Sequence, residues 1–522
     1  MAIGFKVRDL WRAPVLNPIN RKARSIPFLN PINMYGRVFF FAWFGFMIAF
    51  WAWYAFPPLL TVTIKKDLKL TPAQVANSNI VSLSATLLVR IISGPLCDQF
   101  GPRIVFGFIL LLGAIPVGLS PLVQSAGGLY TARFFTGILG GSFVPCMVWS
   151  TGFFDKNVVG TANALTGGFG NAGGGVTYFI MPAVYDSLRK HRGYKPDKAW
   201  RVTFVVPLIM VIATGVALLL LCPDTPDGKW KDRELHAKKN LEEHNVHVAA
   251  APSPVVDVPG SIMDKQQRSR TETSNGGGTE DAIKDDIRFV DHEAHLDRDE
   301  MLETAQGEIV VKPTAKEALE VAVSLQTVMI VLTYMCSFGA ELAINSILAA
   351  YYLKKFPKLG QTKASDWAAM FAFLNLLTRP LGGIISDLLY NSYGRNLWLK
   401  KGWITICGVL SGVFLIVVGQ VDSHNESTVY GLIALAAIFI QAGNGANFSL
   451  VPHVHPFANG IVSGLAGAGG NMGGIFFAVI FRFMDNGTNY AKAFWVIGVI
   501  HIGVNLAVSW IPPVPKNQIG GR

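Results

Sequence analysis

Two arginines stand at equivalent places in two apolar stretches of the sequence. Arg90 lies eight residues before Asp98. Arg379 stands in the same relation to Asp387, and a glycine lies midway in both stretches. If these stretches are membrane helices, each guanidinium lies about 12 Å along the axis from its aspartate, too deep to reach the membrane surface easily. An arginine inside a membrane costs roughly 2.5–3.5 kcal/mol or more, and by default it marks a functional site.

The chemistry that these arginines suggest is the binding of an anion. Glu341 is the only deep carboxylate that we find in the apolar stretches, so two arginines and one acid leave at least one positive charge unbalanced. A guanidinium is planar, stays charged and offers a fork of N–H donors that matches a planar oxyanion. A structural alternative stays open, in which Arg90 pairs with Glu341 while Arg379 donates to backbone carbonyls.

A glycine-rich segment occurs twice in the chain, once in each half. Residues 167–175 read GGFGNAGGG and residues 467–474 read GAGGNMGG, at a constant offset of 300 residues. In each copy three glycines and one asparagine follow a spacing that places them on one face of a helix. A glycine face lets a second helix approach closely in a membrane. A simple packing seam is the alternative to a role in binding. The residues of the two faces are Gly167, Gly170, Asn171, Gly174, Gly467, Gly470, Asn471 and Gly474.

The composition is that of a polytopic membrane protein. Hydrophobic residues make up 51% of the chain and charged residues 15%, against about 25% charged in soluble domains. The mean hydropathy is +0.38. Each span needs ~20 largely apolar residues. We expect twelve spans, at residues 38–59, 77–96, 104–122, 128–151, 163–184, 202–221, 325–352, 367–388, 403–421, 430–446, 460–481 and 494–510. Because both repeated patterns occur once per half, we expect an all-α integral membrane protein with twelve transmembrane helices, built from two pseudo-symmetric six-helix bundles.

The charges divide the chain into five parts. A basic segment, 1–37, precedes an N-terminal bundle, 38–222, and a C-terminal bundle, 318–512, precedes a short tail, 513–522. Between the bundles, residues 223–317 are rich in charges, serine and glycine, which predicts a cytoplasmic and largely disordered linker. The positive charge of the N-terminal segment predicts that both termini are cytoplasmic.

Charge and cysteine content argue against several classes of function. The formal net charge is +11, which in a membrane protein indicates lipid contact, topology and anion attraction rather than nucleic-acid binding. The five cysteines lie far apart, with no pair at metal-ligand spacing, so we predict no metal, no cofactor and no disulfide framework. We expect a transporter and not an enzyme.

The end of the second span carries a distinctive loop. Residues 94–103 read GPLCDQFGPR, which has the pattern G-x-x-x-D-x-x-G-x-R. This pattern resembles the signature loop of the major facilitator superfamily, which in that family joins spans two and three on the cytoplasmic side and latches the halves together. The resemblance implies the major facilitator fold. It also implies a gating role for Gly94, Asp98, Gly101, Arg103 and, in the second half, Asp387.

The paired arginines and paired glycine segments together resemble the nitrate/nitrite porter family of that superfamily, and most of all the fungal high-affinity nitrate transporters. The resemblance covers residues 35–230 and 326–510. In the family the two arginines sandwich the anion, so the resemblance gives this role to Arg90 and Arg379. The other residues that it implies at the site are Asn171 and Asn471 beside the path, Tyr334 as a hydrogen-bonding group, and Phe338, Phe143 and Phe50 as aromatic walls.

The resemblance also implies a function, namely high-affinity uptake of nitrate and nitrite across the plasma membrane by a chain that works as a monomer. Each elementary charge moved against the membrane potential costs ~2.3 kcal/mol per 100 mV, so anion uptake needs coupling. The eukaryotic family is associated with proton symport, and the buried acid Glu341 is our candidate for the proton-coupling group. The partners would be nitrate, nitrite, protons and membrane lipid. Three alternatives stay open: nitrate/nitrite exchange, a nitrate sensor that signals through the linker, and transport of a larger organic anion.

Overall fold

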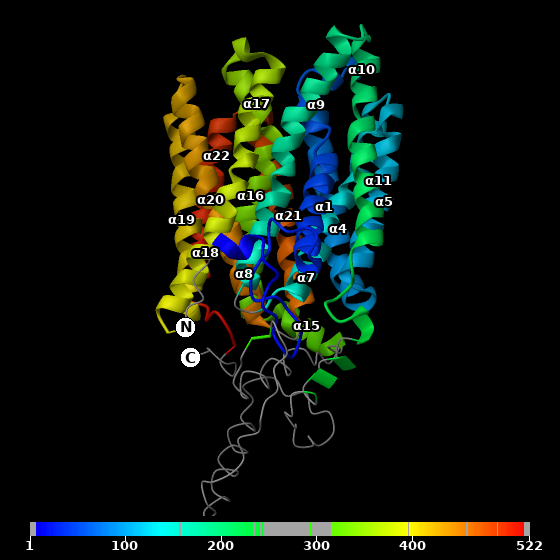
Figure 1. The fold of residues 1–522 in the computed structure, drawn as a ribbon. Coiled ribbons are helices and arrows are strands. Elements are labelled where there is room, and N and C mark those ends of the chain that lie inside the picture. The colour runs from blue at the N-terminus through cyan, green and yellow to red at the C-terminus, as the bar shows by residue number, and fades with distance from the viewer. Residues whose placement is uncertain are drawn as a thin grey trace, which may run out of the picture.

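The computed structural model describes residues 7–155, 158–232, 235–236, 239–240, 243, 293–294, 315–394, 396–455, 458–487 and 489–515. Within these residues the chain is helical, apart from isolated bridges. Figure 1 shows the long helices side by side and roughly parallel. Most of the predicted linker, 223–317, lies outside the described residues.

The helices of the N-terminal half are α1 (Met34–Trp53), α2 (Pro57–Leu60), α3 (Thr63–Asp67), α4 (Pro72–Phe100), α5 (Pro102–Leu119), α6 (Ala126–Thr136), α7 (Phe143–Phe153), α8 (Val159–Asn171), α9 (Gly173–Lys190), α10 (Pro196–Thr203) and α11 (Val205–Leu221). Those of the C-terminal half are α15 (Ala315–Val323), α16 (Leu325–Lys355), α17 (Gly360–Phe373), α18 (Asn375–Ser392), α19 (Leu397–Val421), α20 (Glu426–Val454), α21 (Asn459–Phe483) and α22 (Tyr490–Ala507). A 3-10 turn, η3 (Gly137–Ser142), joins α6 to α7.

Eleven helical segments of the described residues are long and apolar enough to cross a membrane. The twelfth expected span, 163–184, corresponds to α8 and α9, which meet at Ala172. Glycines take the place of much of the apolar surface of this span, which lowers its hydropathy. In Figure 1 α9 continues upward from α8 along the bundle. The fold is therefore the expected all-α arrangement.

Local sequence signals fix both ends of α4, the helix that carries Arg90. The Thr71 side chain accepts the backbone N–H of Gln74, and the Gln74 side chain accepts that of Thr71, which forms a capping box just before Pro72. At the other end Gly101 has φ +90°, a backbone conformation that glycine adopts without strain. Arg90 thus lies in the interior of a helix of 29 residues.

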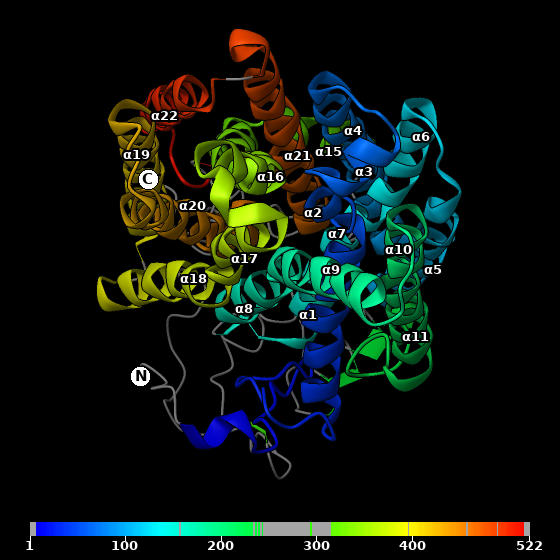
Figure 2. The ribbon, with the colours of Figure 1, turned by 90° about the horizontal axis from the view of Figure 1, so that it is seen from above.

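The two halves meet along two reciprocal helix pairs. In the first pair α4 packs on α21, and in the second pair α18 packs on α8. Seen from above, α8 and α21 lie in the middle of the molecule, between the two groups of helices (Figure 2). Each pair brings the arginine helix of one half against the glycine helix of the other.

Candidate functional site

The two arginines lie in the interior of the protein, on helices of opposite halves. Arg90 of α4 and Arg379 of α18 are both 0% exposed. Arg90 Nε donates to Gly140 O over 2.9 Å, and its Nη1 donates to Gly467 O over 3.1 Å. Arg379 Nη2 donates to the hydroxyl of Tyr334 over 3.0 Å. Neutral oxygens hold each guanidinium, and neither pairs with a carboxylate of the described residues.

The two arginines share two aromatic rings. Arg90 Cζ lies 4.8 Å from the ring centroid of Phe143 and 5.1 Å from that of Phe338. Arg379 Cζ lies 5.7 Å and 5.8 Å from the same two centroids. These distances fit cation–π contacts. Two like charges are thus held near the same rings, and an anion between them would relieve their repulsion.

Further rings enclose this pair of charges. Tyr334 stacks on Phe338 at 5.1 Å, and Phe143 stacks on Phe338 at 6.0 Å, with interplanar angles of 12° and 20°. Phe448 of α20 stands edge-on to both Phe143 and Tyr334, with centroids 5.0 Å away in each case. Flat rings on several sides favour a small planar ligand and exclude water. Phe448 was not predicted from the sequence.

The glycines of the repeated segments leave the space that the arginines and the rings occupy. A Cβ built on Gly167 would lie 2.7 Å from Arg379 Nε, and one on Gly467 would lie 3.4 Å from Arg90 Cδ. The glycine face of each half therefore lies against the arginine of the other half. The remaining glycines of these faces lie against side chains in the same way: Gly170 against Phe46, Gly174 against Phe50 and Asn345, Gly470 against Phe338 and Tyr334, and Gly474 against Leu342 and Leu83.

Several buried polar atoms of the site have no hydrogen-bond partner in the part of the chain that the structure describes. They are Arg90 Nη2, Arg379 Nε and Nη1, both amide atoms of Asn171, and Asn471 Oδ1. Asn471 Nδ2 donates to Gly467 O over 3.0 Å, the same carbonyl that Arg90 contacts. A buried donor without an acceptor costs roughly 1–3 kcal/mol. The unpaired arginine nitrogens therefore favour a ligand that brings hydrogen-bond acceptors.

Glu341 is buried near the site but does not pair with an arginine. Its Oε1 accepts from Asn375 Nδ2 over 2.9 Å, and its Oε2 accepts from Asn444 Nδ2 over 2.5 Å. The carboxyl group is thus held by two neutral amides. The structural Arg90–Glu341 pair that the sequence left open is not formed.

The ring of Phe46 separates Phe50 from the aromatic rings that contact the two arginines. The Phe50 ring stacks on Tyr54 at 4.8 Å and meets Phe46 at 5.9 Å. Phe46 in turn meets Phe143 at 5.5 Å. Phe46 therefore stands between Phe50 and the ring that the arginines share. The sequence offered no signal for Phe46, because the first span has aromatic residues at nearly every turn.

At one end of the bundle, which we call the linker end because α11 leads into the linker there, an aspartate of each half faces a glycine helix of the other. A Cβ built on Gly460, at the start of α21, would lie 2.8 Å from Asp98 Oδ2. One built on Gly160, at the start of α8, would lie 2.6 Å from Asp387 Oδ2. Asp387 Oδ1 also accepts from Lys400 Nζ over 2.5 Å. Both carboxylates approach the positive end of a helix dipole.

The other residues of the expected gating set shape the loop itself. Arg103 Nε pairs with Asp224 over 2.5 Å, and its Nη1 donates to carbonyls at the end of α11. Arg103 therefore ties α5 to α11 within one half. A Cβ on Gly94 would lie 3.2 Å from Gly460 O, so this glycine allows α4 to approach α21. Gly101 supplies the turn between α4 and α5.

At the opposite end of the bundle, hydroxyl groups of the N-terminal half bond to α16. Tyr54 Oη donates to Leu342 O over 3.3 Å, and Tyr178 Oη donates to Asn345 O over 2.6 Å. The halves are therefore joined at both ends. The buried arginines lie between these two sets of contacts.

Comparison with known proteins places the chain in a family. Residues 42–275 match the family model of the Major Facilitator Superfamily. Elsinochrome transporter 1 from Elsinoe fawcettii is 34% identical over 98% of this chain and 99% of its own length. High-affinity nitrate transporter 2.3 from Oryza sativa subsp. japonica is 31% identical over 91% of this chain and 76% of its own length. Nitrate/nitrite transporter NrtP from Nostoc punctiforme is 29% identical over 87% of this chain and 88% of its own length.

The chain belongs to the nitrate/nitrite porter family of the major facilitator superfamily. It is accordingly a transporter and not an enzyme. Among solved structures, the proton:xylose symporter XylE bound to 6-bromo-6-deoxy-D-glucose matches this porter with a TM-score of 0.60, over 92% of this chain and 97% of that chain. At 13% identity this likeness concerns the fold alone.

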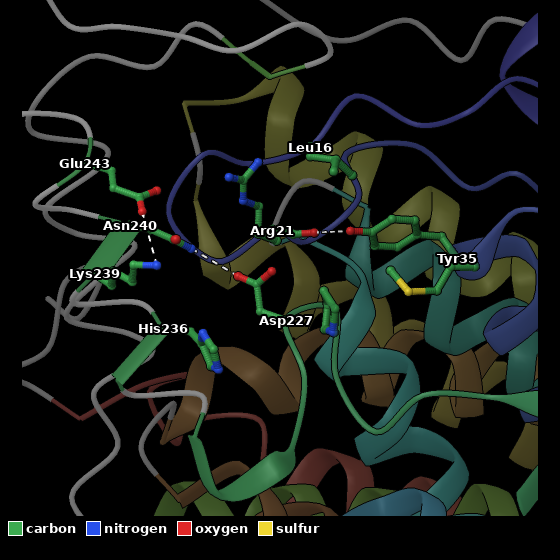
Figure 3. Close-up of a pocket in the computed structure, with 10 residues that line it drawn as sticks. Leu16, Arg21, Tyr35, Asp227, His236, Lys239, Asn240 and Glu243 are labelled. Carbon is green, nitrogen blue, oxygen red and sulfur yellow. Dashed lines mark hydrogen bonds and ion pairs between the residues drawn. The ribbon is translucent and has the colours of Figure 1, made fainter.

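The porter also has a cavity of about 430 Å³ at the linker end, away from Arg90 and Arg379. The N-terminal segment and the residues after α11 line it (Figure 3). Asn240 Nδ2 donates to Asp227 over 3.1 Å, and Lys239 pairs with Glu243 at 3.5 Å. Arg21 Nη1 pairs with Glu293 at 2.6 Å. Most of the charged side chains that line this cavity are already paired. The cavity is therefore a weaker candidate for anion binding than the site around Arg90 and Arg379.

Proposed function

We propose that this porter takes up nitrate, and nitrite, across the plasma membrane by proton-coupled alternating access, with the anion held between Arg90 and Arg379. One observation carries the proposal. Two fully buried guanidinium groups share two aromatic rings, and three of their nitrogens have no acceptor among the described residues. Relatives named as nitrate transporters support the choice of anion.

The residues around the arginines would select a small planar oxyanion. Each guanidinium can donate to an oxygen in its own plane, and Tyr334 fixes the orientation of Arg379 through its hydroxyl. The rings of Phe143 and Phe338 would lie against the anion and keep water out. Nitrate and nitrite are both planar and carry one charge, so the same donors suit both.

Transport would follow from exposing this enclosed site to each side in turn. The contacts of Asp98 and Asp387 with the glycine helices would break to open the linker end, and the hydroxyl contacts of Tyr54 and Tyr178 with α16 would break to open the opposite end. We assign the linker end to the cytoplasm, with both termini, on the basis of the positive charge of residues 1–37. Glu341 is our candidate for carrying the coupled proton, since it is a buried acid held only by amides.

The decisive test is the membrane current that nitrate evokes in oocytes clamped at a negative potential. We expect an inward current that is larger at acid pH and is lost in Arg90→Ala and Arg379→Ala. Arg90→Lys and Arg379→Lys keep the charge but remove the planar fork, so they should also fail to carry nitrate. Entry of labelled nitrate without current, and only when nitrite is loaded inside, would instead identify an electroneutral exchanger and overturn the symport proposal.

A second candidate substrate comes from the relative named Elsinochrome transporter 1, which matches nearly the whole chain. The rings of Phe143, Phe338 and Phe448 contact one another around the arginines, which argues for a small ligand. Efflux of elsinochrome from vesicles that contain the purified porter, with no response to nitrate, would favour this candidate.

A further inference from the structure

A third arginine, Arg133, is buried outside the site described above. It lies on α6, about two turns from the start of that helix, and is 3% exposed. Its Nη1 donates to Ser78 Oγ over 3.1 Å and to Asn79 Oδ1 over 2.5 Å. Its Nε is buried and has no hydrogen-bond partner among the residues that the structure describes. A buried arginine usually pairs with an acid, whereas only neutral groups hold Arg133.

The surroundings of Arg133 form a small polar pocket between the two halves. The pocket has a volume of about 10 Å³, roughly the size of one water molecule. It is lined by Trp53 and Tyr54 of α1, by Asn79, Ser82 and Leu83 of α4, by Arg133, and by Ser346 of α16. Because residues of both halves line the pocket, a rocking motion that separates the halves at this end would enlarge it.

The pocket lies on the outer side of the closure at Tyr54. Tyr54 lines the pocket and also donates to Leu342 O, one of the bonds that join the halves at this end. Arg90 lies eleven residues further along α4 than Asn79, about 16 Å deeper along the helix axis. Arg133, through its bond to Asn79, and Arg90 therefore meet α4 at two different depths.

The loops at this end of the bundle supply the charge that would bring an anion to the pocket. Exposed basic residues gather in the short helices and turns there: Lys66, Lys69, Arg189, Lys190, Arg192, Lys195 and Lys198. Asp67, an acid of the same region, is engaged by Arg201 at 2.9 Å. A concentration of one sign of charge raises the local concentration of the opposite ion and its rate of arrival.

We propose that Arg133, with Asn79 and Ser346, forms a second anion site, where a small oxyanion waits outside the Tyr54 closure before it reaches Arg90 and Arg379. The proposal rests on the function proposed above, because it places this site on the same path. It assigns to Arg133 the capture of the anion from outside, while the central pair holds it during translocation.

The test measures nitrate binding at equilibrium, by dialysis of the purified full-length porter against ¹⁵N-nitrate. The double variant Arg90→Ala/Arg379→Ala removes the central site, and we expect it to retain one weaker site per chain. Adding Asn79→Asp, an isosteric change that gives Arg133 a carboxylate partner, should abolish that remaining binding. Adding Ser78→Ala, which removes one hydrogen bond to Arg133 but no charge, should preserve it.

The outcomes separate the two proposals. If the wild type binds nitrate and the double variant binds none, the second site is refuted while the central site stands. If residual binding survives Asn79→Asp, Arg133 only joins α6 to α4, and the proposal is again overturned. If the wild type binds no nitrate, the proposed function itself fails. In an otherwise wild-type porter, Asn79→Asp should raise the KM for external nitrate by roughly tenfold.

Discussion

Asp98 of one half and Gly460 of the other lie so close that a Cβ on the glycine would be 2.8 Å from the Asp98 carboxylate. The equivalent pair in the repeat, Asp387 and Gly160, gives 2.6 Å. Gly460 is the second residue of α21 and Gly160 is the second residue of α8, so each carboxylate approaches a helix N-terminus, where a negative charge contributes about 0.3–1 kcal/mol. We expect these two contacts to hold the linker end closed, and each of them leaves no room for a Cβ on the glycine.

Replacing Gly460 by alanine should therefore loosen the linker end. The new methyl group would displace the Asp98 carboxylate, and the loss of its contact with α21 would shift the equilibrium toward the open linker end by about 2- to 5-fold. Labelling of an introduced Thr161→Cys from the linker side should become faster by the same factor. Gly431→Ala in α20 is the matched control, because a Cβ there would meet no atom within 4 Å. Equal labelling of both variants would show that Gly460 does not hold the closure.

The glycine face of α8 should matter to binding more than helix packing alone requires. A Cβ at Gly167 would lie 2.7 Å from Arg379 Nε, and overpacking of this kind costs about 1–3 kcal/mol, so we expect Gly167→Ala to weaken nitrate binding by roughly 5- to 100-fold. Gly464→Ala, on the equivalent helix α21, is the control, since its Cβ would be 3.6 Å from the nearest atom. Dialysis against labelled nitrate compares the two. Similar losses in both variants would contradict a specific role for Gly167.

The hydroxyl of Tyr334 should orient one of the two guanidinium groups. Tyr334→Phe removes the acceptor for Arg379 Nη2 and leaves the stacked ring in place. A hydrogen bond to a charged group contributes about 1.5–3 kcal/mol, so the KM for nitrate should rise by roughly tenfold or more. Tyr430→Phe is the control, because Tyr430 Oη has no partner within the described part of the chain. An unchanged KM in Tyr334→Phe would mean that the aromatic ring alone is needed.

The sequence predicted the spans and the two halves, because local composition and repeats determine these features. It did not predict that the arginine helix of each half packs on the glycine helix of the other. It did not predict which rings meet. Phe448 belongs to the site because α20 packs beside α16, although the Gly-x-x-Phe spacing of residues 140–143 recurs at 445–448 and could have drawn attention to it. Phe46 was hidden among many aromatic residues of α1.

Other features depended on contacts that no spacing reveals. Arg133 drew no attention because it lies only two turns from a helix start, where an arginine can ordinarily reach the membrane surface. The resemblance implies a gating role for Arg103 but not its partners, which lie at the end of α11 in the same half.

Glu341→Gln should uncouple transport from protons without unfolding the protein. The amides of Asn375 and Asn444 donate to the carboxylate, and the Oδ1 of each lacks a partner within the described residues, so either amide can rotate to accept from a glutamine. The variant should therefore fold and bind nitrate but lose the increase in current at acid pH, because glutamine takes up no proton. Glu320→Gln is the control, since Glu320 is an exposed acid at the linker end of the C-terminal half. A current in Glu341→Gln that still grows as the pH falls would exclude Glu341 as the proton carrier.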